Sequence, residues 1–148
     1  MADPLNTADL RVARVCAFWE TLSPATLTNL LTVYDDAVRF SDPFNELHGA
    51  APLRGLLERM FERLDAPRFV VLEVALQDNG AVLVWDFHYR LRNWQRERKR
   101  YIYGVSHVRF GADGRVIEHR DYWDAASQVY EQLPLLGSLL RWLKHRVG

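Results

Sequence analysis

The segment Arg115-Val-Ile-Glu-His-Arg-Asp-Tyr-Trp-Asp124 alternates its side chains as a β-strand does, yet it is rich in ionisable groups. Successive side chains of a strand point to opposite faces. One face would then carry Ile117, His119, Asp121 and Trp123. A carboxylate set between apolar neighbours needs a partner, a proton or a chemical role. The surroundings of this face therefore decide what the segment does.

Three helices are predicted ahead of this segment. Thr7 or Asp9 can cap a first helix that runs to about Leu22, and Ser23-Pro24 is a start signal for a second. The third follows Gly49. Its apolar residues recur at helical spacing, with the charged residues outside: Leu53, Leu56, Leu57, Met60, Phe61 and Leu64 against Arg54, Glu58, Arg59, Glu62 and Arg63. A short strand, 37–41, ends at Asp42-Pro43 between the second and third helices.

Beyond Pro67 the apolar period changes to two, which predicts four long antiparallel strands over about 68–77, 81–92, 100–110 and 115–124. Asp78-Asn79-Gly80 favours a tight hairpin turn, because Asn-Gly tolerates positive φ angles, and Gly111 to Gly114 predicts a second hairpin. One face of the second strand carries Leu83, Trp85, Phe87, Tyr89 and Leu91. This aromatic face is expected to point inward.

The C-terminal segment, about 125–147, is predicted to be helical and to be broken by Pro134 and Gly137. It combines apolar residues with a basic end, which suits a helix C-terminus. We expect a lid over a pocket or a subunit contact, and favour either over an amphipathic helix lying on a membrane. Residues 1–148 are thus interpreted as one domain with its core in about 8–124.

Composition narrows the class of protein. The 148 residues carry 19 basic and 19 acidic side chains, so no net field attracts nucleic acid or anionic lipid. Cys16 is the single cysteine, so no intrachain disulfide can form. No apolar run is long enough to span a bilayer. These features favour a cytoplasmic protein that binds neither nucleic acid nor membrane.

The order of helices and strands is of the α+β class, and from about Val12 to Trp123 it resembles the cone-shaped fold of the nuclear transport factor 2-like superfamily. The segment Tyr34-Asp-Asp-Ala-Val-Arg-Phe-Ser-Asp-Pro43 is similar to the one that carries the catalytic aspartate of ketosteroid isomerase, which falls on Asp42. Gly114-Arg-Val-Ile-Glu-His-Arg-Asp121 is similar to the last-strand signature of SnoaL-like polyketide cyclases, whose acid/base aspartate falls on Asp121. The resemblance implies three N-terminal helices packed on a strongly curved antiparallel sheet that encloses a pocket.

Two positions depart from ketosteroid isomerase. Phe18 falls where that family has a tyrosine and Ser106 where it has a protonated aspartate, so two donors of its oxyanion hole are missing. Loss of such preorganised donors costs about 10²-fold or more in rate. The standard isomerase reaction is therefore not expected here.

The resemblance places an aromatic pocket around the polar residues. The expected catalytic residues are Asp121, His119 and Asp42, and the expected ligand-binding residues are Phe18, Phe44, Asn45, Trp85, Phe87, Tyr89, Ser106 and Trp123. Asp121 is either a proton-transfer group oriented by His119 or part of a structural pair, and Asp42 is either a second base or the residue that fixes the Asp-Pro turn. No cofactor or metal is expected, because His88, Asp86 and His107 form only a weak metal pattern.

Three functions fit these residues. The first is cofactor-free acid/base catalysis, of isomerase, cyclase or hydrolase type, on a small hydrophobic or aromatic molecule. The second is binding of such a molecule without reaction, and the third is a dimerisation module with an incidental cavity. Aromatic and histidine side chains on the outer sheet face, among them Tyr101 and Tyr103, favour a homodimer packed sheet to sheet.

Overall fold

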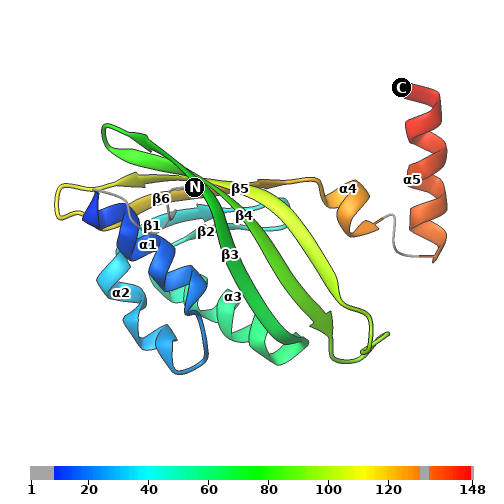
Figure 1. The fold of residues 1–148 in the computed structure, drawn as a ribbon, viewed down its shortest axis with the longest axis horizontal. Coiled ribbons are helices and arrows are strands. Elements are labelled where there is room, and N and C mark those ends of the chain that lie inside the picture. The colour runs from blue at the N-terminus through cyan, green and yellow to red at the C-terminus, as the bar shows by residue number, and fades with distance from the viewer. Residues whose placement is uncertain (1–8, 131–133, 148) are drawn as a thin grey trace.

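The computed structural model describes residues 9–130 and 134–147. Helices come first, then a long run of strands, then two further helices (Figure 1). In chain order the elements are α1 Leu10–Glu20, the 3-10 turn η1 Thr26–Asn29, α2 Leu30–Val33, β1 Tyr34–Ser41, β2 Glu46–His48, α3 Ala50–Arg63, β3 Leu64–Gln77, β4 Gly80–Leu91, β5 Arg100–Phe110, β6 Val116–Trp123, α4 Ala125–Gln128 and α5 Pro134–Val147. The α+β class is confirmed.

The strands form one six-stranded sheet in the order β2-β1-β6-β5-β4-β3. The expectation of a strongly curved, wholly antiparallel sheet is wrong in two respects. Strands β1 and β6 run parallel, and the sheet is twisted rather than strongly curled. The parallel pair arises because β1 leaves α2 at one end of the sheet and joins β6, which lies more than seventy residues later in the chain.

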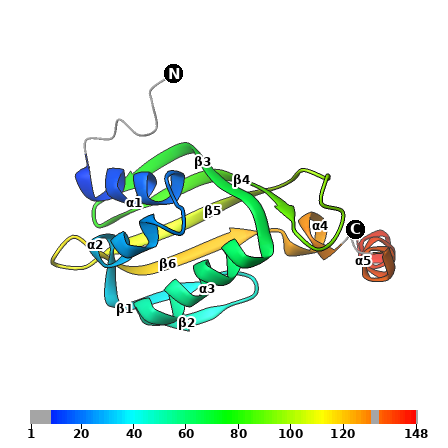
Figure 2. The same cartoon turned by 90° about the horizontal axis from the view of Figure 1, so that it is seen from below.

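Helices α1, α2 and α3 lie on the same face of the sheet (Figure 2). Asp9 caps α1 by accepting a hydrogen bond from the Arg11 amide at 2.9 Å. The main core lies between these helices and the sheet, and its fully buried members include Val12, Val15, Cys16, Tyr34, Val38, Leu53, Val108 and Val116. The second predicted helix is present as η1 followed directly by α2, so its first turn is a 3-10 turn rather than α-helix.

Both predicted hairpins are present. Residues Gln77 and Gly80 pair across the first turn, and Phe110 pairs with Val116 across the second. Gly114 has a φ angle of 82°, a conformation that favours glycine. The inward aromatic face of β4 is also confirmed, since Leu83, Trp85, Phe87 and Tyr89 are all buried. The turn residues and the alternation of apolar side chains depend only on neighbours in the chain, so the sequence alone could predict both features.

Ile117 does not lie on the buried face of β6. It is 38% exposed, while its neighbour Val116 is fully buried. The cause is a break in pairing: Arg109 faces Glu118 and Phe110 faces Val116, which leaves Ile117 as the additional residue of a β-bulge. The predicted alternation holds only beyond this bulge, where His119 is buried.

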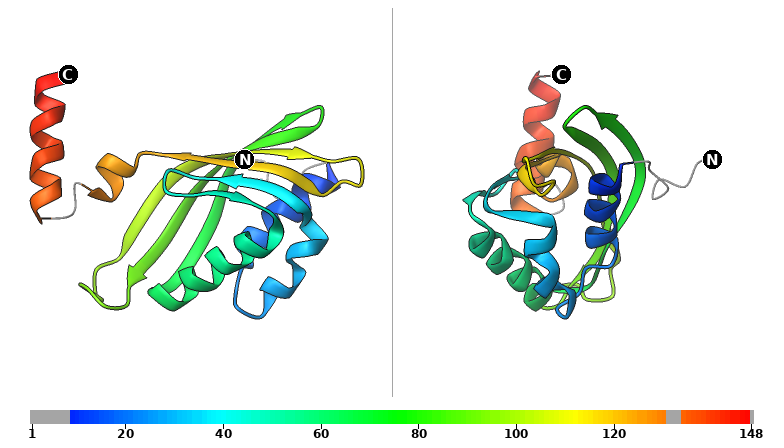
Figure 3. Two further views of the ribbon diagram at one scale, coloured as in Figure 1. Left: turned by 180° about the vertical axis from the view of Figure 1, so that it is seen from behind. Right: turned by 90° about the vertical axis from the view of Figure 1, so that its left-hand side faces the viewer.

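The C-terminal segment forms two helices, as the proline predicted. Helix α5 begins at Pro134, whereas Gly137 does not interrupt it. Figures 1 and 3 show α5 standing away from the sheet and from the three N-terminal helices. Within 9–130 and 134–147, no helix has the length and apolar content needed to cross a membrane.

The outer sheet face exposes the tyrosines on which the dimer prediction rests. Tyr101 and Tyr103 are 65% and 52% exposed, and Tyr122 on the neighbouring strand is 52% exposed. The homodimer itself stays a prediction.

Candidate active site

Strand register brings three polar side chains together on the helix-covered face of the sheet. Ser106 on β5 lies directly opposite Asp121 on β6, and His119 precedes Asp121 by two residues on the same face. The Ser106 hydroxyl donates to Oδ1 of Asp121 at 2.5 Å, and Nε2 of His119 lies 2.7 Å from the same oxygen. The predicted pairing of His119 with Asp121 is therefore present.

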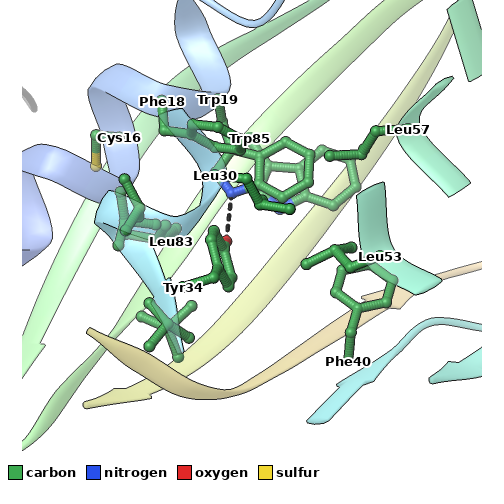
Figure 4. Packing of buried hydrophobic residues seen from close by; sticks show 14 of the residues in the cluster. Cys16, Phe18, Trp19, Leu30, Tyr34, Phe40, Leu53, Leu57, Leu83 and Trp85 are labelled. Atoms are coloured by element: carbon green, nitrogen blue, oxygen red, sulfur yellow. Dashed lines mark hydrogen bonds between the residues drawn. The ribbon is translucent and has the colours of Figure 1, made fainter. Parts of the chain in front are cut away.

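Strand β1 and helix α1 each add an aromatic partner behind the histidine. Nδ1 of His119 lies 2.8 Å from the Tyr34 hydroxyl, at the start of β1. That hydroxyl also accepts a hydrogen bond of 2.7 Å from Nε1 of Trp19 on α1, drawn as a dashed line in Figure 4. Tyr34 is fully buried and His119 is 2% exposed. A continuous hydrogen-bond chain therefore links α1, β1, β6 and β5.

The donors and acceptors of this chain fit one arrangement of protons. With Asp121 ionised, Nε2–H of His119 and the hydroxyl of Ser106 both donate to Oδ1, so Nδ1 is free to accept from Tyr34. Burial raises the pKa of Tyr34 well above its usual value, so this hydroxyl keeps its proton. In this arrangement every donor of the chain meets an acceptor.

Trp85 completes the other end of the chain. Its Nε1 donates to Ser106 Oγ at 2.8 Å, which directs the serine hydrogen toward Asp121. The Trp85 ring lies over Gly104 on β5 so closely that a Cβ at that position would come within 2.4 Å of it. Glycine is therefore required there, and the indole is fixed in place.

Asp121 is the most exposed member of this chain. Its side chain is 14% exposed, against 2% for that of His119. Among the residues that the structure describes, all its hydrogen bonds end on Oδ1, and Oδ2 has no partner. One carboxylate oxygen is thus held by two donors while the other is left without a partner in the described part of the protein.

Asp121 borders three cavities. One is a more open groove of about 490 Å³ between residues 41–43 and 120–123. The aromatic one is a cleft of about 450 Å³, a volume within the usual range for small-molecule sites. Its walls are mostly apolar and aromatic: Trp19, Phe40, Phe44, Leu56, Leu57, Met60, Leu64, Phe69, Trp85, Phe87, Tyr89, Ile102, Trp123 and Val129, joined by Asp42, Asn45, Arg59, Arg63 and Asp121. The smallest has about 20 Å³, room for one water-sized group, and also borders Ser106 and His119.

Asp42 lines the cleft, but both of its carboxylate oxygens accept hydrogen bonds within its own turn. Its Oδ1 accepts from the amides of Phe44 and Asn45, each at 2.7 Å, and both oxygens accept from Nδ2 of Asn45, at 3.0 and 3.1 Å. Phe44 packs edge-on against Trp123, with ring centroids 5.1 Å apart. These contacts favour the interpretation of Asp42 as the residue that fixes the Asp-Pro turn.

Most of the expected pocket residues line the cleft, with three exceptions. Ser106 and His119 lie behind Asp121, on the smallest cavity. Phe18 lies in the core against the rings of Trp19 and Tyr34, and Trp19 takes the place expected for it. The helix is rotated by one residue relative to the expectation, which the sequence could not reveal because both positions are aromatic.

Sequence reasoning missed the roles of Trp19 and Tyr34, and it placed Arg59 and Arg63 outside. Tyr34 falls within the segment that resembles ketosteroid isomerase, but nothing local indicates that its hydroxyl meets a histidine 85 positions later. No group of three or more His, Cys, Asp or Glu side chains in the described part of the chain is arranged to hold a metal ion.

Comparisons with known structures agree with this fold. A hypothetical protein from Catenulispora acidiphila DSM 44928 with a ketosteroid isomerase-like fold, in complex with trimethylamine, matches with a TM-score of 0.68 and 12% identity, over 83% of this chain and 92% of its own. An NTF2-like protein of unknown function from Burkholderia pseudomallei K96243 matches with a TM-score of 0.71 and 17% identity, over 82% of this chain and 95% of its own. An LEH-like epoxide hydrolase from M. tuberculosis matches with a TM-score of 0.67 and 16% identity, over 80% of this chain and 85% of its own.

Identities this low show a shared fold and nothing finer. A search of curated proteins finds no match. The family comparison is more informative, because the model of the SnoaL-like domain matches residues 15–119, which span more than half of the chain and end within β6 at His119. The chain belongs to the SnoaL-like domain family.

Proposed function

We propose that the chain is a cofactor-free acid/base catalyst for a small hydrophobic molecule and that Asp121 is its proton-transfer group. The observation that carries the proposal is the asymmetry of Asp121, which lines an aromatic cleft: Oδ1 is fixed by Ser106 and His119, while Oδ2 has no partner among the described residues. A carboxylate held in this way can take a proton from a carbon next to a carbonyl, or from an attacking water.

His119 is a positioning residue in this proposal. It is 2% exposed and does not line the cleft, so a ligand there cannot contact it. Its hydrogen bond to Tyr34 sets the tautomer and ring orientation, and its Nε2–H then fixes Asp121. Removal of a proton by Oδ2 leaves these donors in place, since both act on the other oxygen.

The cleft supports an aromatic or otherwise flat apolar ligand. Phe69, Phe87 and Tyr89 form a stack whose successive centroids lie 4.3 and 5.2 Å apart. Trp85 and Trp123 add two large rings near Asp121. Such walls gain free energy by burying apolar area, and the few polar groups set the orientation of the ligand.

A second candidate function is ligand binding without reaction. Asp42 favours it, because the turn occupies both of its oxygens. Among the described residues that line the cleft, only Asp121 then has a carboxylate oxygen without a partner. Reactions that need separate acid and base residues would then lack one partner. Proton abstraction and return by a single carboxyl group needs no second residue.

Hydrogen–deuterium exchange tests the proposal directly. 2-Tetralone has exchangeable hydrogens next to its carbonyl, and NMR in deuterated buffer records their loss with and without protein. Abstraction by Asp121 moves the C–H electron pair toward the carbonyl oxygen, and return of a deuteron completes the exchange. Styrene oxide tests the alternative in which Asp121 activates water. We expect the wild type to accelerate at least one of the two reactions.

Two variants make the result specific. Asp121→Asn keeps an oxygen that can accept from Ser106 and His119, so folding should persist while acceleration is lost. Asp86→Asn is the matched control, because Asp86 lies on the opposite face of the sheet, between the buried residues Trp85 and Phe87. An Asp121→Asn protein that still accelerates either reaction as the wild type does would refute the assignment.

A further inference from the structure

Two arginines of α3 face the cleft without an ionic partner. Arg59 and Arg63 are one helical turn apart, are both exposed and both line the cleft beside Leu56 and Met60. Within the described residues, neither forms an ion pair. Like charges at this spacing disfavour a helix slightly. The fold alone therefore gains little from this pair, although a cation at Arg63 does suit the helix C-terminus.

Six other arginines of this molecule do have an acidic partner. Arg11, Arg39, Arg54, Arg92, Arg109 and Arg115 all lie within 4.0 Å of a carboxylate. On α3 itself, Arg54 bonds Glu58 at 3.0 Å one turn further along the helix. That pair does not line the cleft. The same helix thus carries a neutralised pair away from the cleft and a doubly cationic pair on it.

The charges in the cleft are also separated along it. Among the residues that line it, the acidic groups are Asp42 and Asp121, on the sheet side, and the cationic groups are Arg59 and Arg63, on α3. An anionic group would be repelled from Asp121 and attracted to the arginines. The aromatic walls between them would hold an apolar body. This polarity fixes which end of a ligand reaches Asp121.

We propose that Arg59 and Arg63 bind an anionic group, so that the ligand of this cleft is an aromatic or other apolar acid, anchored at α3 with its uncharged end at Asp121. The inference rests on the proposed function only in taking the cleft as the binding site. Arg59 and Arg63 are then specificity-determining residues, and Asp121 is left to act on the uncharged part of the same molecule.

Two fluorescent probes that share an aromatic skeleton provide the test. 8-Anilinonaphthalene-1-sulfonate carries a sulfonate, and N-phenyl-1-naphthylamine is its neutral counterpart. Dissociation constants are measured by emission titration at low ionic strength for the wild type, Arg59→Gln/Arg63→Gln and the control Arg54→Gln. We expect the double variant to weaken the sulfonate probe on the order of 3- to 10-fold, the range for partly exposed ion pairs, and to leave the neutral probe unchanged.

Each other outcome decides against the proposal. An equal loss for both probes would mean that the arginines only shape the cleft, and an equal loss in Arg54→Gln would mean general attraction to the surface. Binding of neither probe would exclude aromatic anions of this size. Asp121→Asn should bind the sulfonate probe at least as well as the wild type, so this test and the exchange assay can fail separately.

Discussion

The two aspartates that border the cleft are held in opposite ways. Asp42 takes its hydrogen bonds from residues two and three positions ahead, within its own turn. Asp121 takes one from the neighbouring strand and one from a histidine that is itself oriented by β1 and α1. The carboxylate of Asp42 is held by a short stretch of chain alone. The carboxylate of Asp121 is held by distant elements and so depends on the whole fold, and it is Asp121 that keeps an oxygen without a partner in the described part of the chain.

Neutralising each aspartate in turn tests whether Asp121 alone acts on the ligand. Asp121→Asn should reduce the exchange or hydrolysis rate by about 10²- to 10⁴-fold, the usual contribution of a general base. Asp42→Asn should reduce it by no more than about tenfold, since its task is to close a turn. Initial rates for both variants, beside circular dichroism spectra, provide the measurement. Equal losses would show that the two carboxylates act together.

Tyr34→Phe tests the distant part of the support. Removing this hydroxyl leaves Nδ1 of His119 without a donor and Nε1 of Trp19 without an acceptor, both in the core. Two buried unsatisfied groups should lower the free energy of unfolding by about 2–4 kcal/mol. Urea denaturation measures this quantity.

Tyr89→Phe is the matched control for that change. Tyr89 is also buried, yet in the described part of the chain its hydroxyl has no hydrogen-bond partner. Its replacement should change the free energy of unfolding by less than about 0.5 kcal/mol. If Tyr34→Phe were equally mild, the chain behind His119 would add nothing to the stability of the fold.

Alkaline pH should have the smallest effect on the free energy of unfolding. It acts through the buried groups behind Asp121. Burial raises the pKa of the Cys16 thiol from 9.0 to about 11 and also raises that of Tyr34. The folded state then binds these protons more tightly than the unfolded chain, so stability falls as the pH rises from about 9 to about 11. The slope should approach about 1 kcal/mol per pH unit.

Cys16→Ala isolates the contribution of the thiol to this slope. Its free energy of unfolding should decline less between pH 9 and pH 11 than that of the wild type. The Asp42 turn contains no group that titrates in this range, so Asp42→Asn should retain the full slope. A Cys16→Ala protein with an unchanged slope would assign the alkaline loss to other groups.

The sequence predicted those features that depend on neighbours in the chain. Asn79-Gly80, the inward face of β4 and the pairing of His119 with Asp121 follow from spacing alone, and resemblance supplied the family. Features that depend on tertiary packing were missed. The rotation that favours Trp19 over Phe18, the bulge at Ile117 and the parallel pairing of β1 with β6 each require contacts between distant segments.

The parallel seam between β1 and β6 has a consequence for how the protein folds. The β3–β4, β4–β5 and β5–β6 pairs are joined by short connections, whereas Tyr34 and His119 are separated by 85 positions. Closing a long loop costs more entropy than closing a hairpin, and parallel pairing is slightly weaker per residue. Irregular register between Tyr34 and Arg39 shortens this seam further. We expect the seam to form last and to open first, so that amide exchange at β1 would report loss of the site while the hairpins stay folded.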